Sequence, residues 1–300
     1  MTQPPSLTAL PNQKLDPRRT PLRPDLAAEH LRGQVEAPRY VTGTPAQIAR
    51  PVVPLRKVPV PTAALETEAL FGEPVTVYDI ADGWAWVQLE TDGYMGYLPA
   101  DTVTRDLKTI THRVKALGTF LYATPEIKSP PLMHLSLNAG LTVVDTVDRF
   151  YQIANGGFVI ARHVAEQGWR DRDFVEVAER FLGTPYLWGG RTRIGLDCSG
   201  LIQLALAACG VKAPRDTDMQ QVELGAAIPI PEDLEKGVQR GDLIFWKGHV
   251  GVMSDAIMML HANAHQMSVS TEPLPQAAAR IKATGSDIVA IKRLAAALAL

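Results

Sequence analysis

Residues 183–190 read GTPYLWGG and residues 196–201 read LDCSGL, and these two runs decide how the C-terminal part of the chain folds. The apolar run 201–209 that follows Cys198 predicts a buried helix with the cysteine in its first turn. There, unpaired backbone N–H groups and the positive end of the helix dipole favour a thiolate. A thiolate attacks carbonyl carbons, and the same N–H groups can receive the resulting oxyanion. The alternative is a buried cysteine that packs as a small hydrophobic side chain.

Two histidines downstream have the spacing of a base and its partner. His249 begins one apolar strand-like run, and His261 ends the next. Adjacent antiparallel strands would set His261 beside His249, where it fixes the tautomer of the imidazole. Cys198, His249 and His261 therefore form a candidate catalytic triad. These three residues are one short of a closed zinc site, which takes four protein ligands, and we predict no metal and no cofactor.

The pattern around these residues is helical first and strand-like later. Apolar residues at i, i+3, i+4 and i+7 predict a helix within residues 173–182. Strand-like runs follow at residues 242–246, 250–253, 257–261, 267–269 and 288–293. This order predicts an α+β domain, with helices packed on an antiparallel sheet, over residues 167–300.

The N-terminal stretch is rich in proline. Twelve of the 23 prolines lie in the first 61 residues. Proline fixes φ and removes a hydrogen-bond donor, so we predict an extended arm over residues 1–29 rather than long helices. The segment 24–32 (PDLAAEHLR) is compatible with one or two helical turns, with Asp25 as the cap.

Short β-like runs with Asp-Gly turns separate the arm from the C-terminal domain, and they repeat. Residues 74–79 (PVTVYD) match residues 140–145 (GLTVVD), and the turn 92–94 (DGY) matches 156–158 (GGF). A solenoid needs three or more repeats, so two copies predict two small β-barrels in tandem. Their predicted boundaries are residues 30–107 and 108–166.

Composition excludes several classes of protein. The net charge of −2 gives no general affinity for nucleic acid or anionic membranes. No apolar run approaches the ~20 residues that cross a bilayer. The N-terminus lacks a basic patch followed by an apolar core, and two cysteines are too few for a disulfide framework. We therefore expect a cytoplasmic protein with no nucleic acid or membrane partner, and the sequence leaves the oligomeric state open.

The motifs around Cys198 and His249 resemble those of the NlpC/P60 cysteine peptidases. Five of them, PYLWGG, DCSG, GDLIF, HVGV and HA, occur in the family's order within about residues 170–293. The tandem β repeat looks like two bacterial SH3 (SH3b) domains, on the strength of Gly83-Trp84 and residues 92–94. The combination is similar to the cytoplasmic γ-D-glutamyl-diamino acid endopeptidases of murein peptide recycling, and it implies two SH3-like barrels followed by a papain-like domain.

The resemblance implies a reaction and roles for the triad. The substrates would be murein peptides of the form L-Ala-γ-D-Glu-diamino acid with a free L-Ala amine, cut after γ-D-Glu. Cys198 would be the nucleophile, His249 the base and His261 the residue that orients it. Tyr186 matches the family tyrosine near the thiol and the oxyanion.

The resemblance also implies substrate-binding residues. Asp197 and Ser199 match positions that hold the substrate, and Arg215 lies in a loop that resembles the family's loop beside the site. Glu73 and Tyr94 of the first β repeat are candidates for the wall around the substrate's amine end. Asp197 and Ser199 have the alternative role of helix caps, and Tyr94 that of a barrel-core aromatic.

Two other functions are compatible with the same sequence. A papain-like amidase or acyltransferase on another amide would use the same triad, because one constellation serves many acyl-transfer substrates. A peptidoglycan-binding protein with little activity would use only the SH3-like pair. Activity that requires a free amine on the peptide distinguishes the endopeptidase from both.

Overall fold

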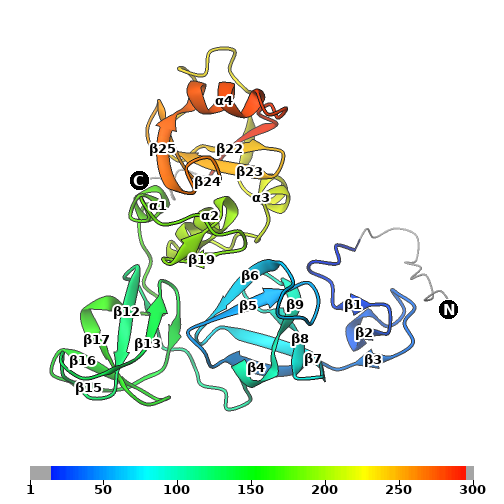
Figure 1. Cartoon of the computed structure of the whole chain (residues 1–300), viewed down its shortest axis with the longest axis vertical. Coiled ribbons are helices and arrows are strands. Elements are labelled where there is room, and N and C mark those ends of the chain that lie inside the picture. The colour runs from blue at the N-terminus through cyan, green and yellow to red at the C-terminus, as the bar shows by residue number, and fades with distance from the viewer. Residues whose placement is uncertain (1–14, 295–300) are drawn as a thin grey trace. The chain divides into compact units, whose positions relative to one another are not determined.

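A computed structural model of the chain describes residues 15–294. The chain divides between Thr109 and Ile110 into two compact units (Figure 1). Within the described range, no helix has the length and apolar character needed to cross a bilayer. The first 14 residues of the predicted arm lie outside this range.

The first unit is built on a seven-stranded sheet in the order β10-β4-β7-β8-β9-β5-β6. Its strands are β4 (Thr44–Ile48), β5 (Val52–Arg56), β6 (Leu65–Leu70), β7 (Pro74–Ala81), β8 (Trp84–Leu89), β9 (Met95–Pro99) and β10 (Val103–Thr104). Asp82 and Gly83 join β7 to β8 with φ of 51° and 79°. Two residues with positive φ are what a tight hairpin turn requires, as the Asp-Gly pair predicts. Alternate strand residues such as Ile48, Val75 and Leu98 point into one core.

The segment before this sheet is mostly extended. β1 (Leu22–Arg23), β2 (Leu26–Ala28) and β3 (Tyr40–Val41) form a three-stranded sheet, and only the 3-10 turn η1 (Glu29–Leu31) is helical. Of the one or two helical turns predicted for residues 24–32, the structure has a single 3-10 turn, and the residues before it form β2. Leu26 packs against Trp86 and Met95, so tertiary packing outweighs helix propensity here. Asp25 caps nothing and pairs with Arg23 instead.

The second unit begins with two small sheets, in the orders β14-β11-β18 and β13-β12-β17-β16-β15. Their strands are β11 (His112–Val114), β12 (Gly118–Tyr122), β13 (Pro131–Ser136), β14 (Gly140–Leu141), β15 (Val143–Val147), β16 (Phe150–Ile153), β17 (Phe158–Ile160) and β18 (Val164–Glu166). The strands β15, β16 and β17, the 3-10 turn η3 (Ala161–His163) and β18 follow the same order as β7, β8, β9, η2 (Ala100–Thr102) and β10. The sequence repeat thus has a structural counterpart.

The rest of the second unit is a six-stranded antiparallel sheet with helices packed on it, in the order β21-β26-β22-β23-β24-β25 (Figure 1). Its strands are β21 (Ala226–Ile228), β22 (Leu243–Trp246), β23 (His249–Met253), β24 (Met258–Asn263), β25 (Ser268–Pro273) and β26 (Ala290–Arg293), with a separate pair, β19 (Arg191–Thr192) and β20 (Gly195–Leu196). The helices are α1 (Phe174–Glu179), α2 (Cys198–Ala208), α3 (Thr217–Glu223) and α4 (Leu274–Lys282).

The helix predicted from the apolar run after Cys198 is α2, and it is buried on nearly all sides. It packs against α1 on one side and against β23 and β24 on the other. The predicted strands correspond to β22 through β26 within a few residues at each end. The domain is therefore mostly sheet with few helices, and its central helix places Cys198 over the strands that carry the two histidines.

Candidate active site

The start of α2 is fixed by the side chain of Asp197. Its backbone is extended and its carboxylate accepts a hydrogen bond from the backbone N–H of Gly200 at 2.7 Å, which makes it the N-cap. The other carboxylate oxygen accepts from the N–H of Gly189 at 2.8 Å. A side chain on Gly200 would lie 2.3 Å from the carbonyl oxygen of Gly190, so only glycine allows this approach. The PYLWGG and DCSG motifs therefore interlock around one aspartate.

A buried arginine completes this network. Arg215, whose side chain is 1% exposed, donates to the two carboxylate oxygens of Asp197 at 3.0 Å and 2.6 Å. It also donates to the hydroxyl of Ser199 at 2.8 Å. This bidentate ion pair fixes the position of the first turn of α2. The structure thus brings together three predicted substrate-binding residues, and their contact with substrate stays a prediction.

The Cys198 thiol is buried beside three hydrogen-bonding groups. Its sulfur lies 3.8 Å from the hydroxyl of Thr217, and the backbone N–H groups of Ser199 and Val250 are directed toward it. Burial, helped by the charge of Asp197, raises the pKa of the thiol to about 11, although the three hydrogen bonds act in the opposite direction. The helix start alone predicts a thiolate; in the structure burial outweighs it, and Cys198 is protonated near neutral pH.

His249 and His261 are hydrogen-bonded neighbours. The Nε2 atom of His249 lies 2.8 Å from the Nδ1 atom of His261. The register of β23 and β24 makes them diagonal neighbours on one face of the sheet. Because Val250 directs its N–H at the Cys198 sulfur, the start of β23 lies against the nucleophile helix. This arrangement leaves Nδ1 of His249 available as the base.

Glu272 lies beside the second nitrogen of His261, and the sequence gives no signal for it. The Nε2 atom of His261 is buried and 2.9 Å from a carboxylate oxygen of Glu272, at an angle that does not make a hydrogen bond. Glu272 sits on β25, next to β24, and forms an ion pair with Arg280 of α4. A carboxylate at this position favours a proton on Nε2 of His261. The Nδ1 atom of His261 then accepts the N–H of His249.

Tyr186 comes from the PYLWGG motif and lies close enough to Cys198 to feel its charge. Its backbone N–H donates to the carbonyl of Met267 at 2.9 Å, which holds the loop against the sheet. Burial raises the pKa of the half-buried phenol, and the charges of Cys198 and Asp197 add to the effect. Tyr186 therefore keeps its proton and offers a hydrogen-bond donor within electrostatic reach of the cysteine.

Comparison with known proteins agrees with this geometry. Residues 183–284 match the NlpC/P60 family. The chain carries an NlpC/P60 peptidase domain. Residues 55–103 of the first unit match the bacterial dipeptidyl-peptidase SH3 domain. The protein is therefore a cysteine peptidase with an SH3-like domain ahead of its NlpC/P60 domain.

The sequence similarity to known proteins extends over most of the chain. A dipeptidyl-peptidase 6 of Lysinibacillus sphaericus is 27% identical over 71% of this chain and 86% of its own length. A γ-D-glutamyl-L-lysine dipeptidyl-peptidase of Bacillus cereus is 29% identical over 70% of this chain and 71% of its own length. The crystal structure of an NlpC/P60 family protein from Bacillus cereus covers 83% of this chain and 99% of its own, with a TM-score of 0.69 and 24% identity. This last comparison shows the fold.

Glu73 and Tyr94 belong to the SH3-like unit rather than to the NlpC/P60 domain. Tyr94 is 2% exposed and packs within the barrel core. The carboxylate of Glu73 accepts hydrogen bonds from the backbone N–H of Leu70, at 2.9 Å, and from the hydroxyl of Thr91. Both side chains thus have structural contacts within their own unit, and their contact with substrate stays a prediction.

Two buried histidines of the NlpC/P60 domain, His249 and His261, are held neutral. Burial lowers the pKa of His249 to about 4, and the charge of Arg280 adds to the effect. Burial also lowers the pKa of His261 to about 3, with His249 and Arg280 contributing. Between these values and the ordinary pKa of 6.5, the unfolded chain binds more protons than the folded chain. Folding stability is therefore lost as the pH falls below about 6.5.

We expect the His261→Asn variant to lose part of this pH dependence. One buried neutral histidine contributes a slope of up to about 1.4 kcal/mol per pH unit below its unfolded pKa. The measurement is the free energy of urea unfolding of the second unit at pH 7.5 and at pH 5. The control is Gln266→Ala, which replaces an exposed residue of the same domain that carries no titratable group and should keep the slope. An equal slope in wild type and His261→Asn would contradict this account.

Proposed function

We propose that this chain is an endopeptidase that cleaves the bond between γ-D-Glu and the diamino acid in cell-wall peptides with a free N-terminal L-Ala. The observation that carries the proposal is the Cys198 thiol at the start of α2 beside the hydrogen-bonded pair of His249 and His261. The names of the curated relatives, γ-D-glutamyl-L-lysine dipeptidyl-peptidases among them, support the substrate class.

In this proposal the thiol is activated at the moment of attack. Because Cys198 and His249 are both neutral in the free protein, the thiol proton passes to Nδ1 of His249 as the sulfur adds to the γ-glutamyl carbonyl carbon. The N–H groups near the helix start and the Tyr186 hydroxyl would donate to the oxyanion. His261, with Glu272 behind it, holds the imidazole in the tautomer that accepts this proton.

The products follow from the same residues. His249 gives its proton to the nitrogen of the diamino acid, which leaves as a free amine, and L-Ala-γ-D-Glu stays attached to the sulfur as a thioester. Water then gives a proton to His249 and adds to the thioester carbonyl. Release of the dipeptide acid restores the Cys198 thiol and the neutral imidazole, so the cycle needs no cofactor.

The remaining parts of the proposal concern the rest of the chain. We assign residues 108–166 as a second SH3b domain, with support from the order of strands and 3-10 turn that it shares with the first. Asp197, Ser199 and Arg215 would border the substrate through the first turn of α2, and Glu73 and Tyr94 would act from the SH3-like domain. A cytoplasmic setting is part of the proposal, and the unpaired state of both cysteines supports it.

The decisive experiment uses defined peptides and mass spectrometry. The wild-type protein should release L-Ala-γ-D-Glu from L-Ala-γ-D-Glu-meso-diaminopimelate or from its L-lysine counterpart, and the faster substrate identifies the diamino acid. The N-acetylated forms of the same peptides are the control and should be cleaved at least about tenfold more slowly, because acetylation removes the charge of the amine. Equal rates on acetylated peptides would favour a broader amidase. Absence of the dipeptide from every peptide would refute the proposed substrate.

A further inference from the structure

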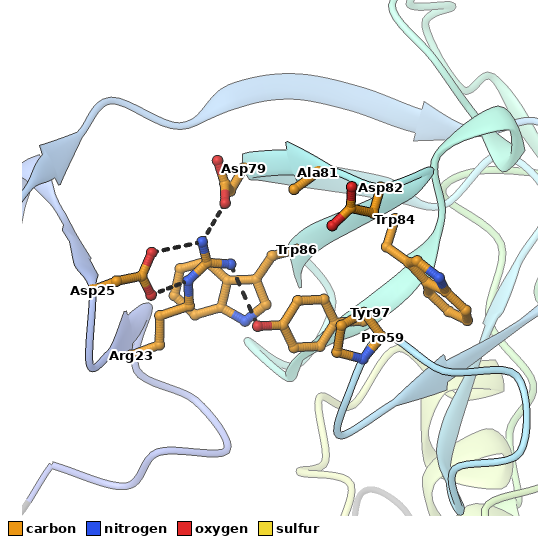
Figure 2. Close-up of a pocket in the computed structure, with 9 residues that line it drawn as sticks. All are labelled: Arg23, Asp25, Pro59, Asp79, Ala81, Asp82, Trp84, Trp86 and Tyr97. Carbon is orange, nitrogen blue, oxygen red and sulfur yellow. Dashed lines mark hydrogen bonds and ion pairs between the residues drawn. The ribbon is translucent and has the colours of Figure 1, made fainter. Parts of the chain in front are cut away.

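The SH3-like unit contains a cavity of about 310 Å³ lined by aromatic rings and carboxylates (Figure 2). Asp79 of β7, Trp86 of β8 and Tyr97 of β9 are direct partners across neighbouring strands, so their side chains share one face of the sheet. Trp84 lies two residues before Trp86 and reaches the same face. Asp82, in the turn between β7 and β8, completes the wall. None of these residues belongs to the NlpC/P60 domain.

One cation of the chain already lies in this cavity. The guanidinium of Arg23 stands 4.9 Å from the ring centroid of Trp86. It forms an ion pair with Asp79 and donates to the hydroxyl of Tyr97 at 3.4 Å. Asp25 holds the same guanidinium from the outer side, at 2.7 Å. A cation above an aromatic face and beside a carboxylate gains from both contacts, so the cavity is built for positive charge.

A second ring and a second carboxylate, those of Trp84 and Asp82, also line this cavity, and Arg23 is the only cation among the described residues that line it. Asp79 faces Trp86 across β7 and β8, and Asp82 and Trp84 stand on either side of Gly83 where these strands turn. Figure 2 shows Trp84 and Asp82 at the end of the cavity away from Arg23. Among residues 15–294, Asp82 has no hydrogen-bond or ion-pair partner. The half-buried Trp84 beside it therefore forms the apolar wall of an acidic subsite.

We propose that the Trp84–Asp82 end of this cavity binds the positively charged amino group of a peptide. The ammonium would lie on the indole face of Trp84 and pair with the carboxylate of Asp82, in the way that Arg23 lies on Trp86 and pairs with Asp79. The cavity has the size of one side chain or a dipeptide, at the small end of ligand pockets in proteins. The lining residues all belong to the first unit, and the existence of this site does not depend on the proposed substrate.

The test follows the tryptophan indole signals of the full-length protein by NMR during titration with three small amides, none of which contains a γ-D-glutamyl bond. N-acetyl-lysine methylamide carries only a side-chain ammonium, norleucine methylamide carries only an α-ammonium, and N-acetyl-norleucine methylamide carries none. We expect the Trp84 signal, assigned with a Trp84→Phe variant, to shift with one or both cationic ligands and not with the neutral one. The ligand that binds identifies which kind of amine the site accepts.

The matched variants are Asp82→Asn and Asp101→Asn. Asparagine tolerates the positive φ of residue 82, so the first variant removes the charge and keeps the turn. We expect it to weaken binding of the cationic ligand by roughly fivefold. Asp101 is an exposed carboxylate of the same unit that does not line the cavity, and its variant should bind as wild type does. The proposal would be overturned if the neutral amide shifted the Trp84 signal equally, or if no ligand shifted it. It would also be overturned if Asp82→Asn bound the cationic ligand with unchanged affinity.

Discussion

We expect the Cys198→Ala variant to lose roughly four to six orders of magnitude in kcat/KM on a cleaved peptide, as removal of the nucleophile does in comparable triads. Without the sulfur no thioester forms, and His249 has no thiol proton to accept. Alanine is the best helix former and is smaller than cysteine, so α2 should keep its fold. The loss of activity would then report on the chemistry alone. The measurement is product formation by mass spectrometry at matched protein concentration.

The control is the other cysteine of the chain. Cys209 follows α2 at its far end, is buried and also has a raised pKa, so it shares the chemical character of Cys198 without the histidines. Cys209→Ala should keep activity within about threefold of wild type, since the substitution removes only a small buried group. Retention of activity in Cys198→Ala, or equal losses in both variants, would contradict the assignment of the nucleophile.

The parts of the site that sequence predicts are those encoded by local pattern. An apolar run behind a cysteine predicts α2, and two apolar runs that each carry a histidine predict strands that place His249 next to His261. Both inferences use only side-chain periodicity and the short reach of a strand turn. The repeat of β-like runs is also predicted from local pattern, because both copies keep their turn residues.

The parts that sequence does not predict depend on contacts across the fold. Nothing in residues 268–273 indicates that Glu272 is the carboxylate beside His261. The two residues are neighbours only because β25 pairs with β24 in the sheet. The thiol pKa depends on total burial, which a helix-start pattern does not measure. Residues 26–28 form a short strand rather than a helix because Leu26 packs against Trp86 and Met95 of the SH3-like sheet. In each case tertiary packing outweighs the local signal.

Arg215→Met should destabilise the second unit by about 3–5 kcal/mol, because it leaves the Asp197 carboxylate buried without its counter-charge. In the wild type both carboxylate oxygens are bonded to this arginine, whose side chain is 1% exposed. The remaining donors, the N–H groups of Gly200 and Gly189 and the hydroxyl of Ser199, do not neutralise the charge. The measurement is urea unfolding monitored through the hydrogen exchange of peptides from α2, so that the signal comes from this unit alone.

The double variant Asp197→Asn/Arg215→Met separates the lost charge pair from lost packing. Asparagine still accepts the N–H of Gly200, and the buried charge is gone, so the double variant should be more stable than Arg215→Met by about 1 kcal/mol or more. Arg180→Met is the matched control, since Arg180 pairs with Asp171 at 3.3 Å on the surface of the same unit. It should cost no more than about 1 kcal/mol. If Arg215→Met cost no more than Arg180→Met, the buried pair would not be what holds the first turn of α2, and the position of the Cys198 thiol would need another explanation.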